Sequence, residues 1–258
     1  MVNKRLPALT MKEEGIDEMN YIHMLSRLGM GSAHPGGFEA TLRMLKNYPI
    51  QPGSRILEVG CGTGRTACHL SEMGYQVTAI DLNENMIKKA RARAEAMGMD
   101  VEFLQADVCA LPFEDNRFDL IMAESVTVFT DTSKSLPEYY RVLDRGGVLL
   151  DRELLLDKPM PKPKLKELLE FFGIPNLMMK EEWAGALMSC GFKQAEFLEY
   201  NHFNEQLKEE QTRHLDAFEQ RDKGLLFDAA LWETLFKHDR MILDNTDFLA
   251  SALFRAVK

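Results

Sequence analysis

Cysteine is scarce in this chain of 258 residues, which contains four: Cys61, Cys68, Cys109 and Cys190. No two of them have the C-x-x-C spacing that is typical of metal-binding and redox motifs. We therefore interpret them as reduced, structural thiols of a cytosolic protein, rather than as metal ligands or reactive groups. No metal site is expected.

Long apolar runs and an excess of positive charge are also missing. The beginning of the sequence has no signal-peptide core, and no apolar run approaches the length that spans a membrane. Lys and Arg number 31 against 40 Asp and Glu, which gives a formal net charge of −9. An acidic surface disfavours nucleic acid and anionic membranes as main partners. We expect a cytoplasmic protein that binds neither.

The stretch from 54 to 82 is the most informative part of the sequence. An apolar run at Ile56–Val59 ends in three alternating glycines, and a second run at Val77–Ile80 ends on Asp81. Between the two runs, Thr63 is expected to cap a helix that ends at Gly74. The glycines are Gly60, Gly62 and Gly64. Strand, glycine turn, helix, strand and acid in this order are typical of half a nucleotide-binding α/β sheet.

Two ligands fit this pattern. The run from Gly62 to Ala67 matches a variant of the dinucleotide fingerprint, so NAD stays an alternative. Glu58, however, lies two residues before Gly60, where its carboxylate would repel a pyrophosphate and attract a cation. S-adenosylmethionine carries a sulfonium, an ammonium and a ribose but no phosphate. Asp81 suits the ribose hydroxyls.

Three blocks of sequence resemble the class I S-adenosylmethionine-dependent methyltransferases. They are Leu57-Glu-Val-Gly-Cys-Gly-Thr-Gly64, Asp107-Val-Cys-Ala-Leu-Pro-Phe113 followed by Phe118-Asp119, and Arg141-Val-Leu-Asp-Arg-Gly-Gly147. No dehydrogenase pattern needs the second block, which weakens the case for NAD. The wording is most similar to the small-molecule and ubiquinone/menaquinone-type branch, with a methyltransferase domain 11-like pattern. The resemblance covers about residues 50–156.

The resemblance implies a Rossmann-like α/β fold. Its sheet is expected to be seven-stranded and mostly parallel, with the last strand antiparallel and helices on both faces. We expect a single domain over residues 1–258. Within it, residues 1–37 would form an N-terminal helical lid and 38–156 the cofactor-binding core. Residues 157–258 would form a C-terminal half with a helical insertion of two helices at about 205–243.

Several local features are also predicted. The third strand is expected to end at Asp107 and the last to run from Thr246 to Val257. The helix that contains Pro137 is expected to begin near Ser135, because proline is tolerated in a first turn. Basic residues of the helix from 84 to 97 are expected to form a solvated face. The fifth strand, 148–156, is apolar except for three interrupting residues, Asp151, Arg152 and Glu153.

The resemblance also implies the cofactor site. Glu58 and the glycine turn would hold the methionine moiety, Asp81 the ribose, and Asp107 with the amide of Val108 the adenine. The full set of predicted cofactor-binding residues is Glu58, Gly60, Cys61, Gly62, Gly64, Asp81, Leu82, Met86, Asp107, Val108, Glu124 and Ser125.

Three side chains are candidates for a general base, in the order Glu124, His34 and Tyr21. Glu124 and Ser125 follow the fourth strand, at the edge where donor and acceptor meet, although the pair fits equally a turn that lines the cofactor through its backbone. His34 lies in the loop Gly29-Met-Gly-Ser-Ala-His-Pro-Gly-Gly37, which suits either a lid or a flexible connection.

The sequence therefore predicts methyl transfer from S-adenosylmethionine to a small-molecule acceptor, with S-adenosylhomocysteine as product. The protein would be a monomer or a homodimer. Two alternatives stay open. One is a non-catalytic S-adenosylmethionine-binding or interaction protein, and the other is an NAD-dependent oxidoreductase.

Overall fold

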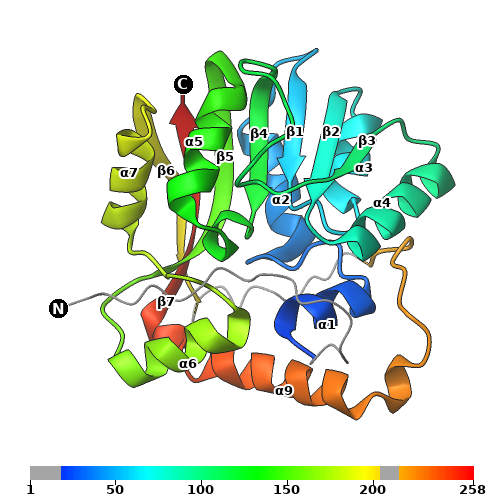
Figure 1. The fold of residues 1–258 in the computed structure, drawn as a ribbon, viewed down its shortest axis with the longest axis vertical. Coiled ribbons are helices and arrows are strands. Elements are labelled where there is room, and N and C mark those ends of the chain that lie inside the picture. The colour runs from blue at the N-terminus through cyan, green and yellow to red at the C-terminus, as the bar shows by residue number, and fades with distance from the viewer. Residues whose placement is uncertain (1–18, 204–214) are drawn as a thin grey trace.

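The computed structural model describes residues 19–203 and 215–258. Seven strands form one sheet in the order β3-β2-β1-β4-β5-β7-β6 (Figure 1). The strands are β1 Arg55–Val59, β2 Gln76–Asp81, β3 Glu102–Gln105, β4 Phe118–Glu124, β5 Leu143–Leu156, β6 Gln194–His202 and β7 Leu249–Val257. The pairs among β3, β2, β1, β4 and β5 are parallel, and β7 is antiparallel to both β5 and β6. The predicted fold class is confirmed.

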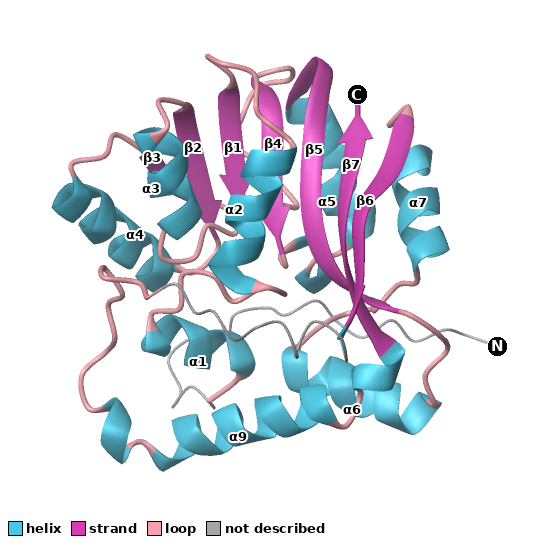
Figure 2. Cartoon of the chain, turned by 180° about the vertical axis from the view of Figure 1, so that it is seen from behind, coloured by secondary structure: helices cyan, strands magenta, loops and turns pink. Residues whose placement is uncertain are grey.

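Eight helices surround the sheet in the described part of the chain. They are α1 Tyr21–Leu28, α2 Gly37–Asn47, α3 Arg65–Glu72, α4 Glu84–Met97, α5 Thr132–Val142, α6 Lys162–Phe172, α7 Lys180–Ser189 and α9 Ala229–Leu243. Helix α2 lies on one face of the sheet, and α5 lies on the opposite face (Figures 1 and 2). Helices α1, α6 and α9 form a separate layer below the carboxyl ends of β1, β2 and β4 (Figure 2). That layer is placed to cover a ligand bound at this edge.

The capping residues explain where α3 and α4 begin. Asn83 caps α4 as its spacing suggests, because its side chain accepts from the amide N–H groups of Asn85 and Met86. The prediction that Thr63 caps α3 is wrong. The N-cap is Gly64, whose left-handed φ of 74° turns the chain directly into the helix without a side-chain cap.

Three predicted boundaries are corrected. Strand β3 ends at Gln105, and Asp107 lies beyond it in a turn. Helix α5 begins at Thr132, because the side chain of Asp131 caps it, and Pro137 therefore lies inside the helix. Strand β7 begins at Leu249, since Thr246–Phe248 form a 3₁₀ turn.

The helical insertion before β7 is only partly as predicted. Residues 204–214 lie outside the described residues, so the first helix of the insertion is not described over that range. Leu215 and Phe218, expected on its apolar face, are outside any helix and are exposed. The second helix is α9, and its Leu231 is fully buried against the main core.

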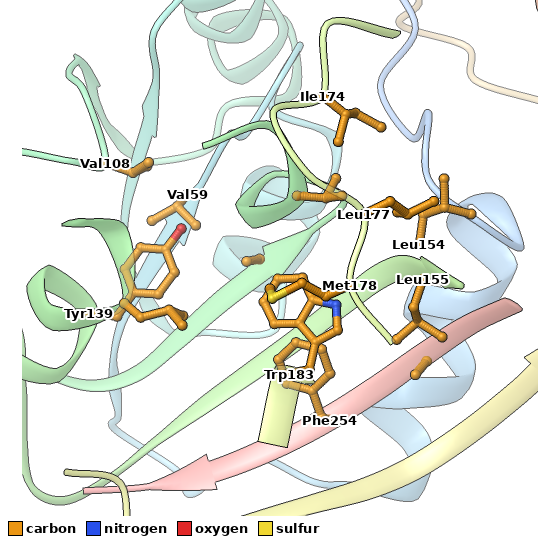
Figure 3. Close-up of a cluster of buried hydrophobic side chains, with 14 of the residues drawn as sticks. Val59, Val108, Tyr139, Leu154, Leu155, Ile174, Leu177, Met178, Trp183 and Phe254 are labelled. Atoms are coloured by element: carbon orange, nitrogen blue, oxygen red, sulfur yellow. The ribbon is translucent and has the colours of Figure 1, made fainter. Parts of the chain in front are cut away.

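The largest core cluster lies between the sheet and α5 and α7, and it extends to the layer of α1, α6 and α9. Trp183 of α7 is fully buried and lies against Phe254 of β7, with ring centroids 5.1 Å apart (Figure 3). Val59 and Tyr139 belong to the same cluster, so packing links it to the end of β1. This continuous core fixes the end of the central strand.

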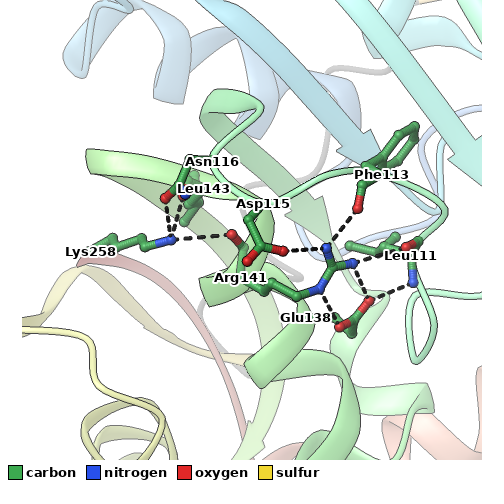
Figure 4. Close-up of polar contacts among 8 residues, drawn as sticks. All are labelled: Leu111, Phe113, Asp115, Asn116, Glu138, Arg141, Leu143 and Lys258. Carbon is green, nitrogen blue, oxygen red and sulfur yellow. Dashed lines mark hydrogen bonds and ion pairs between the residues drawn. The ribbon is translucent and has the colours of Figure 1, made fainter.

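Arg141 joins two of the blocks that carry the family resemblance (Figure 4). Its guanidinium donates to the carbonyls of Phe113 at 2.6 Å and Leu111 at 3.0 Å, and it pairs with Glu138. Glu138 in turn accepts from the amide N–H of Leu111. These bonds join the Leu-Pro-Phe block to the Arg-Val-Leu block. Both blocks therefore have a structural role, because together they fix the segment after β3.

Candidate functional site

Three acidic residues lie at the carboxyl ends of neighbouring parallel strands. Glu58 is the penultimate residue of β1, Asp81 is the last of β2, and Glu124 is the last of β4. The register pairs Val59 with Ile80, so β1 and β2 end almost level. The strand order reverses at β1, and ligands of open α/β sheets bind at such a point. We refer to Glu58, Asp81 and Glu124 as the acidic edge.

Asp81 fixes the glycine turn through two backbone contacts. Its carboxylate accepts from the amide N–H of Gly62 at 2.9 Å and from that of Asn83 at 2.8 Å. Burial raises the pKa of Asp81, and these two hydrogen bonds act in the opposite direction. A carboxylate offers about four acceptor positions, so Asp81 keeps capacity for two hydroxyl donors.

Gly60 is required by a close contact with the segment that follows β4. Its φ is +62°, and a Cβ at this position would lie 2.2 Å from Cγ2 of Val126. Val126 therefore packs directly on the glycine turn. The sequence alone gave no signal for Val126, because an ordinary valine in a loop has no distinctive pattern.

Glu58 has the least satisfied carboxylate of the acidic edge. The residue is 8% exposed, and Oε2 has no hydrogen-bond partner among the described residues. Burial raises the pKa of Glu58 well above its ordinary value, and the charges of Glu124 and Asp81 add to the effect. A buried, unpartnered carboxylate oxygen beside two other acids suits a cation. These residues fit the sulfonium and ammonium groups of S-adenosylmethionine and oppose the pyrophosphate of NAD.

The residues predicted for the adenine side of the site differ in their exposure to solvent. Leu82 is 56% exposed and Asp107 is exposed, whereas Met86 and Val108 are buried in the main core. The side chain of Asp107 accepts from the amide N–H of Cys109 at 2.8 Å. The predicted residues thus combine a buried apolar surface with an accessible carboxylate.

Cys61 and Ser125 flank the acidic edge. The Cys61 thiol is buried, and burial followed by the charges of Glu58 and Asp81 raises its pKa well above the usual range. It therefore stays protonated and does not act as a nucleophile. Ser125 has a left-handed φ of 56°, and its buried Oγ has no partner among the described residues.

Two of the three candidate bases lie together. His34 Nε2 is 3.6 Å from Glu124 Oε2 and 3.3 Å from the hydroxyl oxygen of Thr41. The Thr41 hydroxyl donates to both oxygens of Glu124, at 3.0 and 2.9 Å. Arg152 lies on the other side of Glu124, with Nε 3.6 Å from Oε1. Sequence reasoning missed Thr41, and the only signal for Arg152 was a charge within an apolar strand.

These contacts determine the tautomer of His34. The single hydroxyl proton of Thr41 is donated to Glu124, so His34 Nε2 must be the donor in the Thr41 contact. Burial lowers the pKa of His34, which keeps the ring neutral near pH 7. Nδ1 therefore carries a lone pair, and no hydrogen bond of normal geometry reaches it in the described part of the chain, although a contact with the backbone of Pro35 raises the pKa of His34 and partly offsets the effect of burial.

Tyr21, the third candidate, does not join this group. Its ring lies in an aromatic cluster formed by α1, α6, α9 and the turn after β4. The neighbours are Phe129, Phe171, Phe172 and His238, with centroid distances from 4.8 to 6.4 Å. Burial raises the pKa of the Tyr21 hydroxyl to about 12. This placement gives Tyr21 a packing role in the layer below the acidic edge.

The loop between α1 and α2 lies over the glycine turn. A Cβ added to Gly31 would lie 2.7 Å from the Thr63 hydroxyl, and one added to Gly62 would lie 3.7 Å from the carbonyl of Met30. A Cβ on Gly29 would lie 2.2 Å from the carbonyl of Gln220. The loop between α1 and α2 therefore contacts both the glycine turn and the chain at Gln220.

Two basic residues of α4 hold the chain from 215 to 222 in place. Arg93 is 2% exposed and pairs with Asp216 at 2.7 Å, and Lys89 is 7% exposed and pairs with Asp222 at 2.7 Å. Lys89 also donates to the carbonyl of Ser26 at 2.6 Å. The prediction that these residues form a solvated face is wrong for Lys89 and Arg93, because their partners come from distant parts of the sequence.

Two surface cavities lie elsewhere. One of about 220 Å³ is bordered by α3, α4 and residues 215–218. The other, about 550 Å³, lies at the opposite edge of the sheet and is bordered by Arg55, Thr78 and Arg117. In this conformation, therefore, neither of them opens onto the acidic edge.

The described residues contain neither a metal-binding cluster nor a membrane-spanning helix. No group of three or more His, Cys, Asp or Glu side chains is arranged to hold a metal ion. Over the same residues, no helix is both long and apolar enough to cross a bilayer.

Known proteins share both the sequence and the fold. Residues 56–147 match the model of a methyltransferase domain. The chain is 32% identical over 238 residues to the uncharacterized methyltransferase YodH of Bacillus subtilis, a match that covers 92% of this chain and 99% of that protein. It is 43% identical over 113 residues to a demethylmenaquinone methyltransferase of Thermus thermophilus, covering 43% of this chain and 49% of that protein.

The fold is similar to that of a solved complex with S-adenosylmethionine, phosphoethanolamine N-methyltransferase 2 of Haemonchus contortus. The TM-score is 0.74 and the identity 25%, and the match covers 92% of this chain but only 57% of that one. With the acidic edge and the sheet order, these findings establish the family. The chain belongs to the class I S-adenosylmethionine-dependent methyltransferases, and its cofactor is S-adenosylmethionine.

Proposed function

We propose that this chain transfers the methyl group of S-adenosylmethionine to a small-molecule acceptor. The observation that carries the proposal is the unpartnered Oε2 of Glu58 within the acidic edge. It supports a cationic ligand at the ends of β1, β2 and β4.

Each part of the acidic edge has a proposed role. Glu58 would neutralise the cationic methionine moiety, and the backbone of Gly60 and Gly62 would allow its close approach. Asp81 would accept the ribose hydroxyls, and Asp107 the adenine amino group. When bound, the cofactor supplies a methyl group that its sulfonium already activates. The protein then mainly has to orient the acceptor and exclude water.

His34 is the proposed general base. Both Glu124 oxygens accept from Thr41, whereas the neutral His34 ring has an unpartnered lone pair at Nδ1. A hydroxyl or amine acceptor would pass its proton to this atom. Glu124 and Thr41 would orient the ring, since together they fix Nε2 as the donor.

A small-molecule acceptor is supported by charge and by relatives. The net charge of −9 disfavours a polyanionic substrate. The named relatives include a demethylmenaquinone methyltransferase and a phosphoethanolamine N-methyltransferase. A transfer assay with labelled methyl donor and a fractionated cell extract tests the proposal. Label is expected in low-molecular-mass products, and label mainly in RNA or protein would contradict it.

Residues 1–37 are proposed to act as a lid of this single domain. The described part of the segment lies over the glycine turn through Met30 and Gly31. Entry of the cofactor would therefore require this loop to move away from the turn.

Replacing Asp81 by alanine is expected to weaken S-adenosylmethionine binding by at least about tenfold, because each charge-assisted hydrogen bond contributes ~1.5–3 kcal/mol. Titration calorimetry measures the change. Asp100→Ala is the control, because Asp100 is an exposed acid before β3. This variant should bind S-adenosylmethionine with the affinity of the wild type. If Asp81→Ala binds S-adenosylmethionine as tightly as the wild type does, Asp81 does not belong to the binding site.

Binding of S-adenosylmethionine is expected to release a proton from Glu58. The pKa of Glu58 is raised in the free protein, and a cation favours its carboxylate, so affinity should increase as the pH rises. Calorimetry in buffers with different ionisation enthalpies counts the released protons. Glu58→Gln should release none and should bind with a flatter pH dependence. A wild-type affinity that stays constant or falls as the pH rises would contradict this role.

A further inference from the structure

Two buried carboxyl groups of β5 take no part in the site described above. Asp151 and Glu153 are both fully buried, and they lie two residues apart on one strand, so their side chains point to the same face of the sheet. Arg152 between them points to the other face, where it pairs with Glu199 at 2.8 Å. The pair therefore has no counterion from its own strand.

Glu153 and Asp151 bind the segment that follows β4. One oxygen of Glu153, Oε1, accepts from the amide N–H of Val126 at 2.9 Å and from that of Thr127 at 2.7 Å. The Thr127 hydroxyl donates to Oδ2 of Asp151 at 2.7 Å. These three bonds determine where Val126 lies, and Val126 packs on Gly60 of the glycine turn.

The two remaining oxygens of the pair are unsatisfied if both groups are ionised. Oδ1 of Asp151 and Oε2 of Glu153 are buried and have no partner among the described residues. A single proton between the two carboxyl groups would satisfy both oxygens at once, since a protonated carboxyl donates and a carboxylate accepts. Such a proton belongs to the pair and not to either residue.

The surroundings favour retention of that proton. Burial raises the pKa of both carboxyls, and no lysine or arginine is among the groups that shift either pKa. Tyr139 of α5 faces the pair, with Cys109 beyond it, whereas Glu124 of β4 lies on the face of Arg152 and raises the pKa of Asp151 from there. The paired residues on the neighbouring strands are Ala123, Ala252 and Phe254.

We propose that Asp151 and Glu153 share one proton and act as a positioning pair that holds the segment Ser125–Phe129 against the glycine turn. When the pH rises and the proton leaves, two adjacent buried carboxylates repel each other and the segment loosens. The proposal deepens the proposed function, because this segment borders the acidic edge. Its tests use the protein without cofactor, so they do not depend on methyl transfer.

Infrared spectroscopy of the wild-type protein tests the shared proton directly. A carbonyl band of a buried, protonated carboxyl is expected at neutral pH and should disappear in alkaline titration. Asp151→Asn should remove the component of the band that belongs to the pair, because the amide replaces the proton donor, whereas Glu58, whose pKa is also raised by burial, keeps its own component. Glu196→Gln, which removes a half-exposed carboxyl of β6, should leave it unchanged. A wild-type protein without the band overturns the proposal, and so do equal bands in the wild type and in Asp151→Asn, or in Glu153→Gln if the first variant does not fold.

Hydrogen exchange tests the positioning role. As the proton leaves, repulsion between the two carboxylates should displace Glu153, the acceptor of the amides of Val126 and Thr127. After correction for intrinsic rates, both amides should then lose protection by about tenfold or more, because hydrogen bonds to a charged acceptor are among the stronger ones. Asp151→Asn, a permanent mimic of the protonated pair, should keep its protection over the same pH range. Glu153→Gln provides the same test if the first variant does not fold. Equal alkaline loss in the wild type and the variant would contradict the proposal.

Discussion

Gly60→Ala is expected to abolish cofactor binding and to lower the free energy of unfolding by about 2–5 kcal/mol. Two effects add. Alanine is strained at the left-handed φ of +62°, and its Cβ would lie 2.2 Å from Cγ2 of Val126. The turn and the segment after β4 cannot both keep their positions. Denaturant unfolding and calorimetry with S-adenosylmethionine measure the two losses.

The double variant Gly60→Ala/Val126→Ala separates these effects. It removes the two closest contacts, those with the Cγ atoms of Val126, and leaves a Cβ–Cβ distance of 3.0 Å and the backbone strain. The double variant should therefore be more stable than the sum of the two single losses predicts. Additive losses would show that Val126 does not pack on Gly60 in solution.

Arg93→Met is expected to lower the free energy of unfolding by about 3–5 kcal/mol, which corresponds to a decrease in Tm of roughly 10 °C. The substitution leaves the buried Asp216 side chain with the longer contact to Arg65, at 3.9 Å, as its only ion pair among the described residues. It also removes the donor to the Thr63 carbonyl at 2.8 Å. Thr63 lies in the glycine turn, so the loss of stability should be accompanied by weaker cofactor binding. Thermal unfolding with and without S-adenosylmethionine gives both results.

Lys88→Met on the same helix is the matched control. The Lys88 side chain is 64% exposed, and its ion pair within the described residues is with Glu84, at 3.0 Å across one turn of α4. Its removal should change stability by less than about 0.5 kcal/mol. Equal destabilisation by the two substitutions would show that the Arg93–Asp216 pair is not formed in solution.

The sheet was predictable from the sequence because its signals are local. Apolar runs that end in glycine or aspartate mark β1 and β2, and Asn83 with Gly98 marks the two ends of α4. The predicted start of a helix was wrong where a nearby residue takes the N-cap position instead of the expected one. Asp131 caps α5 ahead of the expected start, and the glycine Gly64 takes the position assigned to Thr63.

The acidic edge was predictable for the same reason, since each acid lies at the end of an apolar run: Glu58 is next to last in its run, and Asp81 and Glu124 come directly after theirs. Its surroundings were not, because they depend on contacts between distant residues. In the sequence, Lys89 and Arg93 lie on a helix face that is typical of solvent exposure. In the folded chain, residues after β6 place Asp222 and Asp216 against them. Likewise, no spacing in the sequence connects Thr41 with Glu124, which lie 83 residues apart.

The central claim is that acids at the ends of β1, β2 and β4 bind a cationic sulfur nucleoside and reject a pyrophosphate. Calorimetric titration of the protein with S-adenosylmethionine, S-adenosylhomocysteine and NADH tests it most directly. Saturable binding of the first two and no detectable binding of NADH is the predicted result. Binding of NADH, or no binding of S-adenosylmethionine, would contradict the account.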